Sequence, residues 1–134
     1  MIVSVRGLSK SYGTKAVLQS ISFTIKRAEV IGFLGPNGAG KTTTMRLLTG
    51  YLKSHTGAIS ISGNDPVYQR EKVSQMTGYL PENNPLYGDM KVHEYLDYVA
   101  ELKNKASYST LVKTVGVRDV LHKKIETLSR GYKQ

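Results

Sequence analysis

Gly35, Gly40, Lys41 and Thr42 form the pattern G-x-x-x-x-G-K-[ST] within the segment GPNGAGKTT. Glycine at both ends lets the backbone turn tightly and aim consecutive N–H groups inward, where a Cβ would block an approaching anion. An ammonium group and a hydroxyl group follow directly. These residue types at this spacing predict a phosphate-binding loop of the P-loop class, which holds ATP together with Mg²⁺.

Positions 35 to 43 each have an expected part in that chemistry. Lys41 reaches the β- and γ-phosphates as a point charge and is the catalytic candidate, because it can neutralise charge that develops during phosphoryl transfer. The Thr42 hydroxyl is expected to bind Mg²⁺, and Thr43 to steady a phosphate oxygen. A glycine-rich turn with an incidental lysine is the alternative. The backbone of the loop is expected to line the site with Gly35, Pro36, Asn37, Gly38, Ala39 and Gly40.

The segments on either side of the loop support the functional interpretation. Val30 to Leu34 is a continuous apolar run, which predicts a strand buried on both faces of a parallel sheet. From Lys41 onward, Met45, Leu48 and Leu52 recur at helical spacing. A helix that begins at the loop would direct its unpaired N–H groups and its positive dipole end toward the phosphates.

The remaining segments predict an α/β fold. Alternating or β-branched runs predict a layer of short antiparallel strands, and a second buried strand is expected to end at Pro81. Two helices follow, the second of which ends at Gly116. The expected strands are Ile2 to Val5, Ser20 to Ile25, Ala58 to Ser62 and Gln75 to Leu80, and the expected helices are Lys91 to Lys103 and the segment around Leu111, Val112 and Val115.

Length and composition are those of one small soluble domain. The chain has 134 residues, 40% of them hydrophobic and 22% charged. Its apolar runs are far shorter than the roughly 20 residues that cross a bilayer. The N-terminus lacks a secretory pattern and the chain has no cysteine, so a cytoplasmic location is expected.

The net charge of +9 is concentrated late in the chain, where residues 103–134 hold eight basic and two acidic side chains. Such a segment could attract nucleic acid or an anionic membrane surface, or could simply form a solvated face. We favour the solvated face. Nucleic acid is therefore not among the expected partners.

The P-loop by itself leaves GTPases, small-molecule kinases and recombination ATPases open. Three further segments narrow the choice. Leu128 to Gln134, LSRGYKQ, resembles the LSGGQ signature of ATP-binding-cassette (ABC) ATPases; Gly78 to Asn83, GYLPEN, resembles their Q-loop; and Tyr12 in KSYG lies where that family places an aromatic ring. The resemblance covers essentially all 134 residues and is strongest to the ATPases of ABC-2-type exporters, including those named for gliding motility, drug resistance or polysaccharide export.

The resemblance implies roles for four further residues. Tyr12 would stack on adenine, although a surface aromatic is an equal alternative. Glu82 would act at Mg²⁺ or the attacking water, as a catalytic residue and metal ligand. Ser129 and Gly131 would contact the γ-phosphate of the nucleotide bound to the opposite subunit, which is compatible with Ser129 capping a helix.

The sequence departs from the common family pattern at three positions. Glu82 replaces the usual glutamine, and a carboxylate can also bind Mg²⁺. Arg130 and Tyr132 replace glycine and glutamine of the signature. All three changes are typical of the exporter branch that the sequence resembles, so they do not weaken the family assignment.

The expectation that follows is a partial ABC ATPase domain over residues 1–134, with a P-loop core and antiparallel β layer in 1–80. Residues 81–134 would hold the Q-loop, a truncated helical subdomain and the start of the signature helix. In the family, a homodimer of such domains encloses two ATP molecules and drives an integral membrane subunit from the cytoplasmic face. The transported substrate cannot be inferred, because the membrane subunit selects it.

The family places a Walker B strand, a D-loop and a switch histidine after the signature, and none is present here. His55, His93 and His122 all precede the signature. We therefore expect weak ATP binding and negligible turnover by these residues alone. A soluble ABC protein acting on nucleic acid or ribosomes, and a nonhydrolysing regulatory fragment, are the alternatives.

Overall fold

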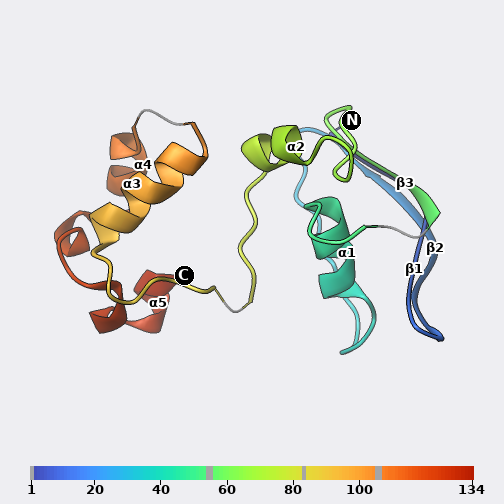
Figure 1. Ribbon diagram of the computed structural model, residues 1–134, viewed down its shortest axis with the longest axis horizontal. Coiled ribbons are helices and arrows are strands. Elements are labelled where there is room, and N and C mark those ends of the chain that lie inside the picture. The colour runs from blue at the N-terminus through green and yellow to red at the C-terminus, as the bar shows by residue number, and fades with distance from the viewer. Residues whose placement is uncertain (1, 54–55, 83, 105–106) are drawn as a thin grey trace. The chain divides into compact units, whose positions relative to one another are not determined.

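The computed structural model divides the chain into two compact units, Met1–Tyr79 and Leu80–Gln134. Each unit is described by itself below, with its elements labelled as in Figure 1. The structure describes residues 2–53, 56–82, 84–104 and 107–134.

The first unit contains a three-stranded antiparallel sheet. Strands β1 (Val3–Tyr12) and β2 (Lys15–Ile25) form a long hairpin, and β3 (Thr56–Ile61) pairs with the other edge of β1, so the order is β2-β1-β3. Val3 pairs with Ile25 on one side and with Ile61 on the other. The predicted antiparallel layer is confirmed, with longer strands than the sequence pattern indicated.

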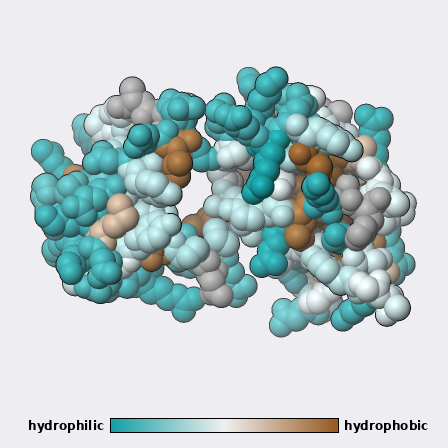
Figure 2. All heavy atoms as spheres, viewed as in Figure 1, coloured by the Kyte–Doolittle hydropathy of each residue, from teal (hydrophilic) through white to brown (hydrophobic). Residues whose placement is uncertain are grey.

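A helix packs its apolar side against this sheet. Helix α1 (Lys41–Leu48) buries Thr44, Leu47 and Leu48, and the short helix α2 (Arg70–Met76) buries Val73. Hydrophilic side chains cover most of the face drawn in Figure 2. The predicted helix after Lys41 is confirmed. The buried core consists of Val5, Leu8, Leu18, Leu47, Leu48, Ile59, Ile61 and Val73.

Both predicted parallel strands are wrong in this structure. Val30 to Leu34 has no strand structure, and the side chains of Val30 and Leu34 are 97% and 94% exposed. An apolar run becomes a strand only where a neighbour satisfies its backbone groups, and within residues 2–53, 56–82, 84–104 and 107–134 no strand lies parallel to it. Of the second run, Gln75 and Met76 instead complete α2.

The second unit is helical, and the two predicted helices are confirmed. Helix α3 spans Val92–Leu102 and α4 spans Ser109–Val115, where Gly116 ends the helix in the left-handed conformation. The single-turn segments η1 (Arg118–Val120) and η2 (Ile125–Thr127) lead to α5 (Arg130–Lys133). None of the helices in the described part of the chain is long and apolar enough to cross a membrane.

A backbone ladder joins residues 88–93 to residues 121–126 in this unit. The segment that precedes α3 therefore runs antiparallel to the segment that leads to α5. The first N–H groups of α3 are thereby satisfied by carbonyls of the returning chain. The ladder comprises Glu126 N to Gly88 O (3.0 Å), Ile125 N to Met90 O (2.9 Å), Val92 N to Lys123 O (3.1 Å) and His93 N to Leu121 O (3.0 Å).

Two leucine variants test this account of the first unit. Leu47→Ala should lower the free energy of unfolding by about 2–5 kcal/mol, because it removes a fully buried side chain and leaves a cavity. Leu34→Ala removes the same atoms from an exposed side chain and should cost about 0.5 kcal/mol or less. Urea unfolding followed by circular dichroism measures both. Equal losses would contradict the described core.

Candidate nucleotide-binding site

The phosphate-binding loop of residues 35–40 leads directly into α1 in the first unit. A hydrogen bond from Ala39 N to Pro36 O, 3.2 Å long, closes a turn with Asn37 and Gly38 at its centre. Gly38 has φ +85° and Gly40 has φ +86°, a left-handed conformation that glycine adopts without steric cost. The loop is exposed up to Ala39 and becomes buried at Gly40.

Close packing on β2 and the left-handed backbone conformation both favour glycine at position 40. A Cβ built on Gly40 would lie 2.6 Å from the Leu18 Cδ2 atom and 3.0 Å from the Val17 carbonyl oxygen. Gly40 is also the N-cap residue of α1. The contact therefore seats the start of the helix directly on the sheet. Sequence reasoning missed Val17 and Leu18, because nothing in their local pattern indicates a contact with the loop.

Lys41 lies across the loop that precedes it. Its Nζ atom donates hydrogen bonds to the carbonyl oxygens of Gly35 (2.7 Å) and Pro36 (2.8 Å). A positive charge is thus held against the loop by two neutral acceptors. A phosphate oxygen is a stronger acceptor for an ammonium group than a carbonyl, so these bonds can be exchanged for bonds to an anion.

The first turn of α1 offers a matching set of donors. It contains no acidic residue, and the first N–H groups of a helix have no partner within the helix. Thr42 is exposed and Thr43 is half-buried. Thr44 is buried, and its hydroxyl donates to the Gly40 carbonyl (3.0 Å), which ties the turn to the loop. This loop and helix terminus therefore fit a phosphate group, and the free Thr42 face fits a hard cation beside it.

Tyr12 ends the strand β1, in the hairpin whose second strand supports Gly40. Its side chain is 48% exposed, and the Lys10 Nζ atom lies 5.3 Å from its ring centroid. An aromatic ring with an open face can stack on another planar ring. The structure therefore leaves Tyr12 able to contact a base.

The other predicted site residues belong to the second unit. Glu82 is exposed and lies outside helices and strands, and Asn83 lies outside the described residues. Ser129 is the N-cap of α5, where its hydroxyl oxygen accepts a hydrogen bond from Tyr132 N (3.5 Å), and Gly131 is exposed in that helix. The capping role anticipated for Ser129 is present in the structure.

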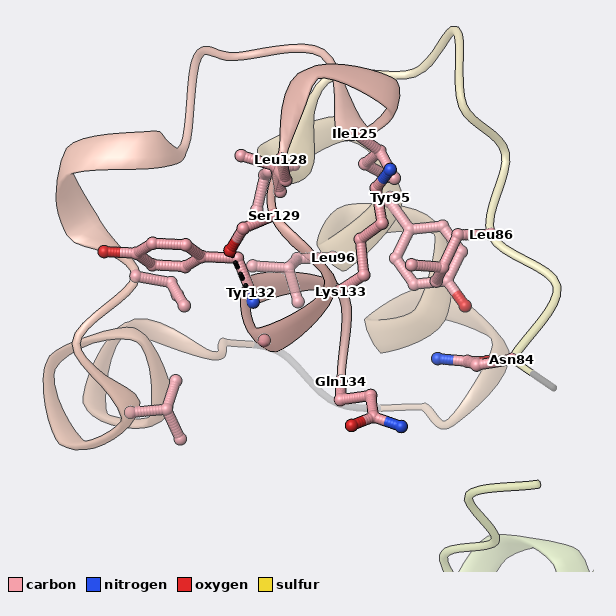
Figure 3. A pocket seen from close by; sticks show the side chains of 14 residues that line it. Asn84, Leu86, Tyr95, Leu96, Ile125, Leu128, Ser129, Tyr132, Lys133 and Gln134 are labelled. Carbon is pink, nitrogen blue, oxygen red and sulfur yellow. Dashed lines mark hydrogen bonds between the residues drawn. The ribbon is translucent and has the colours of Figure 1, made fainter. Parts of the chain in front are cut away.

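A cavity of about 600 Å³ lies beside Ser129 and Gly131 (Figure 3). Tyr95 and Leu96 of α3 contribute to its largely apolar wall. Burial raises the pKa of Tyr95 above its usual value, with smaller contributions from Tyr87 and Tyr98. The apolar stripe of α3 was visible in the sequence, but its position next to the signature was not.

Fold and site together define an α/β nucleotide-binding protein of the P-loop class. The sequence profile of the ABC transporter family matches residues 18–134. The uncharacterized ABC transporter ATP-binding protein YdbJ of Bacillus subtilis is 36% identical over 136 residues, which cover 99% of this chain and 44% of YdbJ. The linearmycin resistance ATP-binding protein LnrL of the same organism is 31% identical over 139 residues, with 99% and 46% covered.

Among solved structures, an ATP-binding subunit of an ABC transporter superposes with a TM-score of 0.88 at 28% identity, covering 99% of this chain and 58% of that one. The chain belongs to the ABC transporter family. It spans less than half the length of the two relatives described above.

Two alanine variants test the close contact between the loop and strand β2. Gly38→Ala should lower the free energy of unfolding by about 1–2 kcal/mol, the cost of a left-handed conformation with a Cβ, since no atom lies within 4 Å of that Cβ. Gly40→Ala adds a clash with β2 and should cost clearly more. The difference in thermal unfolding midpoint between the two variants is the measurement. Equal midpoints would contradict the close contact with Val17 and Leu18.

Proposed function

We propose that this chain is the ATP-binding part of an ABC transporter subunit. The observation that carries the proposal is the phosphate-binding loop, in which Gly40 packs on β2 and Lys41 is held against the loop at the N-terminus of α1. Membership of the ABC transporter family supports a role in transport rather than in the other chemistries that P-loops perform.

ATP binding would use groups that the loop already presents. The Lys41 ammonium would exchange its two carbonyl acceptors for phosphate oxygens, while loop and helix N–H groups would donate to the same phosphates. Thr43 would add a hydroxyl donor. Tyr12 would stack on adenine and so select a nucleotide over other polyphosphates.

Mg²⁺ would be held by the Thr42 hydroxyl together with the phosphates, and Glu82 would supply a carboxylate ligand or orient water when the complete site assembles. The exposed oxygens of both residues suit a hard cation. When bound there, the cation would neutralise phosphate charge. Lys41 would share in that neutralisation through its own positive charge.

The second unit would complete the site in a dimer. Ser129 and Gly131 at the start of α5 would face the γ-phosphate held by a second copy, so a homodimer would enclose two nucleotides. Closure of this dimer would drive an integral membrane subunit from the cytoplasmic face of the membrane. Export is the direction that we propose, supported by the resemblance to ABC-2-type ATPases and by the resistance function in the name of LnrL.

We also propose that these 134 residues bind ATP without sustained turnover. None of the acidic residues after Glu82 follows an apolar run of the kind that precedes the family's catalytic carboxylates. Glu82 and Lys41 alone would position the phosphates, but a base for the attacking water would be lacking.

Lys41→Ala should weaken binding of Mg·ATP about tenfold to a hundredfold, because charge-assisted hydrogen bonds to phosphate are lost. Lys15→Ala, which removes an exposed lysine from β2 of the same unit, is the matched control and should change affinity little. Isothermal titration calorimetry of both variants gives the comparison. Unchanged affinity in Lys41→Ala, with circular dichroism like that of the unaltered chain, would refute the proposed site.

Tyr12→Ala should weaken ATP binding about fivefold or more, since one aromatic ring stacked on a base contributes about 1–3 kcal/mol. Binding of inorganic tripolyphosphate, which has no base, should not change. Tyr68→Ala removes a tyrosine that is 88% exposed in the same unit and serves as the control. An equal loss for ATP and tripolyphosphate would assign Tyr12 a structural role instead.

A further inference from the structure

The tip of the phosphate-binding loop carries a chemically reactive dipeptide, Asn37-Gly38. The chain has five asparagines, and only Asn37 is followed by glycine. The Asn37 side chain is exposed, and the pair occupies the centre of the turn closed by Ala39 N and Pro36 O. An asparagine carboxamide next to an accessible backbone nitrogen can react with that nitrogen.

Gly38 leaves this nitrogen unobstructed. A Cβ placed on Gly38 would meet no atom within 4 Å, so the space around the residue is open. The hydrogen bond of the turn uses the N–H of Ala39, and in the described part of the chain the N–H of Gly38 has no hydrogen-bond acceptor. The nucleophile and the carboxamide are therefore both accessible.

The other described asparagines with a described neighbour lack this combination. Asn64 donates from Nδ2 to the Ser62 carbonyl (3.1 Å), and the next backbone N–H, that of Asp65, donates to Gln69 Oε1 (3.1 Å). Asn84 precedes Pro85, whose nitrogen carries no hydrogen. Asn37 is thus set apart by its free following amide as well as by its sequence.

We propose that Asn37 is a site of spontaneous deamidation that nucleotide binding suppresses. The Gly38 nitrogen loses its proton to hydroxide and attacks Cγ of Asn37. The new N–Cγ bond forms as the Cγ–Nδ2 bond breaks, and Nδ2 leaves as ammonia after taking a proton from solvent. Water then opens the cyclic imide at either carbonyl, which yields aspartate or isoaspartate at position 37, and no group is oxidised or reduced.

The product places a carboxylate in a loop built to receive phosphate. Isoaspartate also adds a methylene group to the main chain, which shifts the N–H groups that follow. Conversely, phosphate oxygens that accept hydrogen bonds from the loop would hold its N–H groups and hinder the attack. This consequence and this protection rest on the proposed ATP binding, whereas the reaction at Asn37 does not.

The reaction is tested by ageing the 134-residue chain in mildly alkaline buffer, with and without saturating Mg·ATP. Peptide mass mapping detects the replacement of amide by acid, and protein isoaspartyl methyltransferase detects isoaspartate. Without nucleotide, Asn37 should convert faster than Asn64, the internal control in the same digest. Conversion of Asn64 while Asn37 stays intact, or no conversion at Asn37, would overturn the proposal.

Two variants separate the chemistry from its effect. Asn37→Asp should bind Mg·ATP about tenfold more weakly than the unaltered chain, because like charges meet in the loop. Asn37→Gln cannot close the five-membered ring readily, so ageing should not reduce its affinity below its own starting value. Loss of affinity on ageing in Asn37→Gln, or full affinity in Asn37→Asp, would overturn the functional effect.

The protection of Asn37 by bound nucleotide is tested by comparing the conversion of Asn37 with and without Mg·ATP. Slower conversion at Asn37 in Mg·ATP supports it, and equal conversion in a chain that measurably binds Mg·ATP overturns it. A chain that does not bind Mg·ATP at all would instead refute the proposed function, while mass mapping would still decide the reaction at Asn37.

Discussion

The close approach of Gly40 to strand β2 is the contact on which the rest of the phosphate-binding loop depends. The absence of a side chain lets α1 begin directly against Val17 and Leu18. The left-handed conformation at that residue turns the chain from the loop into the helix. Because the helix begins there, its unpaired N–H groups follow directly after the loop against which the Lys41 ammonium is held. If the loop and the helix were farther apart, the helix dipole, the N–H donors and the lysine charge could not act on the same anion.

The hydrophobic core explains how the loop can be exposed to solvent while the helix that follows it is packed against the sheet. Leu47 and Leu48 anchor α1 on the hairpin of β1 and β2, so burial of apolar surface stabilises the position of the helix terminus. Residues 35–39 of the loop are exposed, and none of them belongs to the buried core. The arrangement separates stability, which lies in the sheet and helix, from the proposed nucleotide binding, which would use backbone N–H groups and Lys41.

In the second unit, backbone hydrogen bonds between two chain segments position Ser129. The ladder between residues 88–93 and 121–126 satisfies the N-terminus of α3 and directs the chain toward α5. Ser129 then caps that helix with its own hydroxyl group. The path of the chain toward Ser129 therefore depends on main-chain hydrogen bonds between two segments that are far apart in the sequence. Such bonds do not require particular side chains, so the sequence pattern does not indicate them.

The sequence by itself determined the phosphate-binding loop, the helix after it, the antiparallel layer and the two amphipathic helices, because each depends on local spacing or on glycine at a turn. It also carried the family resemblance through Tyr12 and the segments around Glu82 and Ser129. Only the tertiary structure decided that Val30 to Leu34 forms no strand, that Leu18 lies close to Gly40, and that Tyr95 and Ser129 line the same cavity. An apolar run states that a segment can be buried, but whether it pairs or packs depends on neighbours that local pattern does not specify.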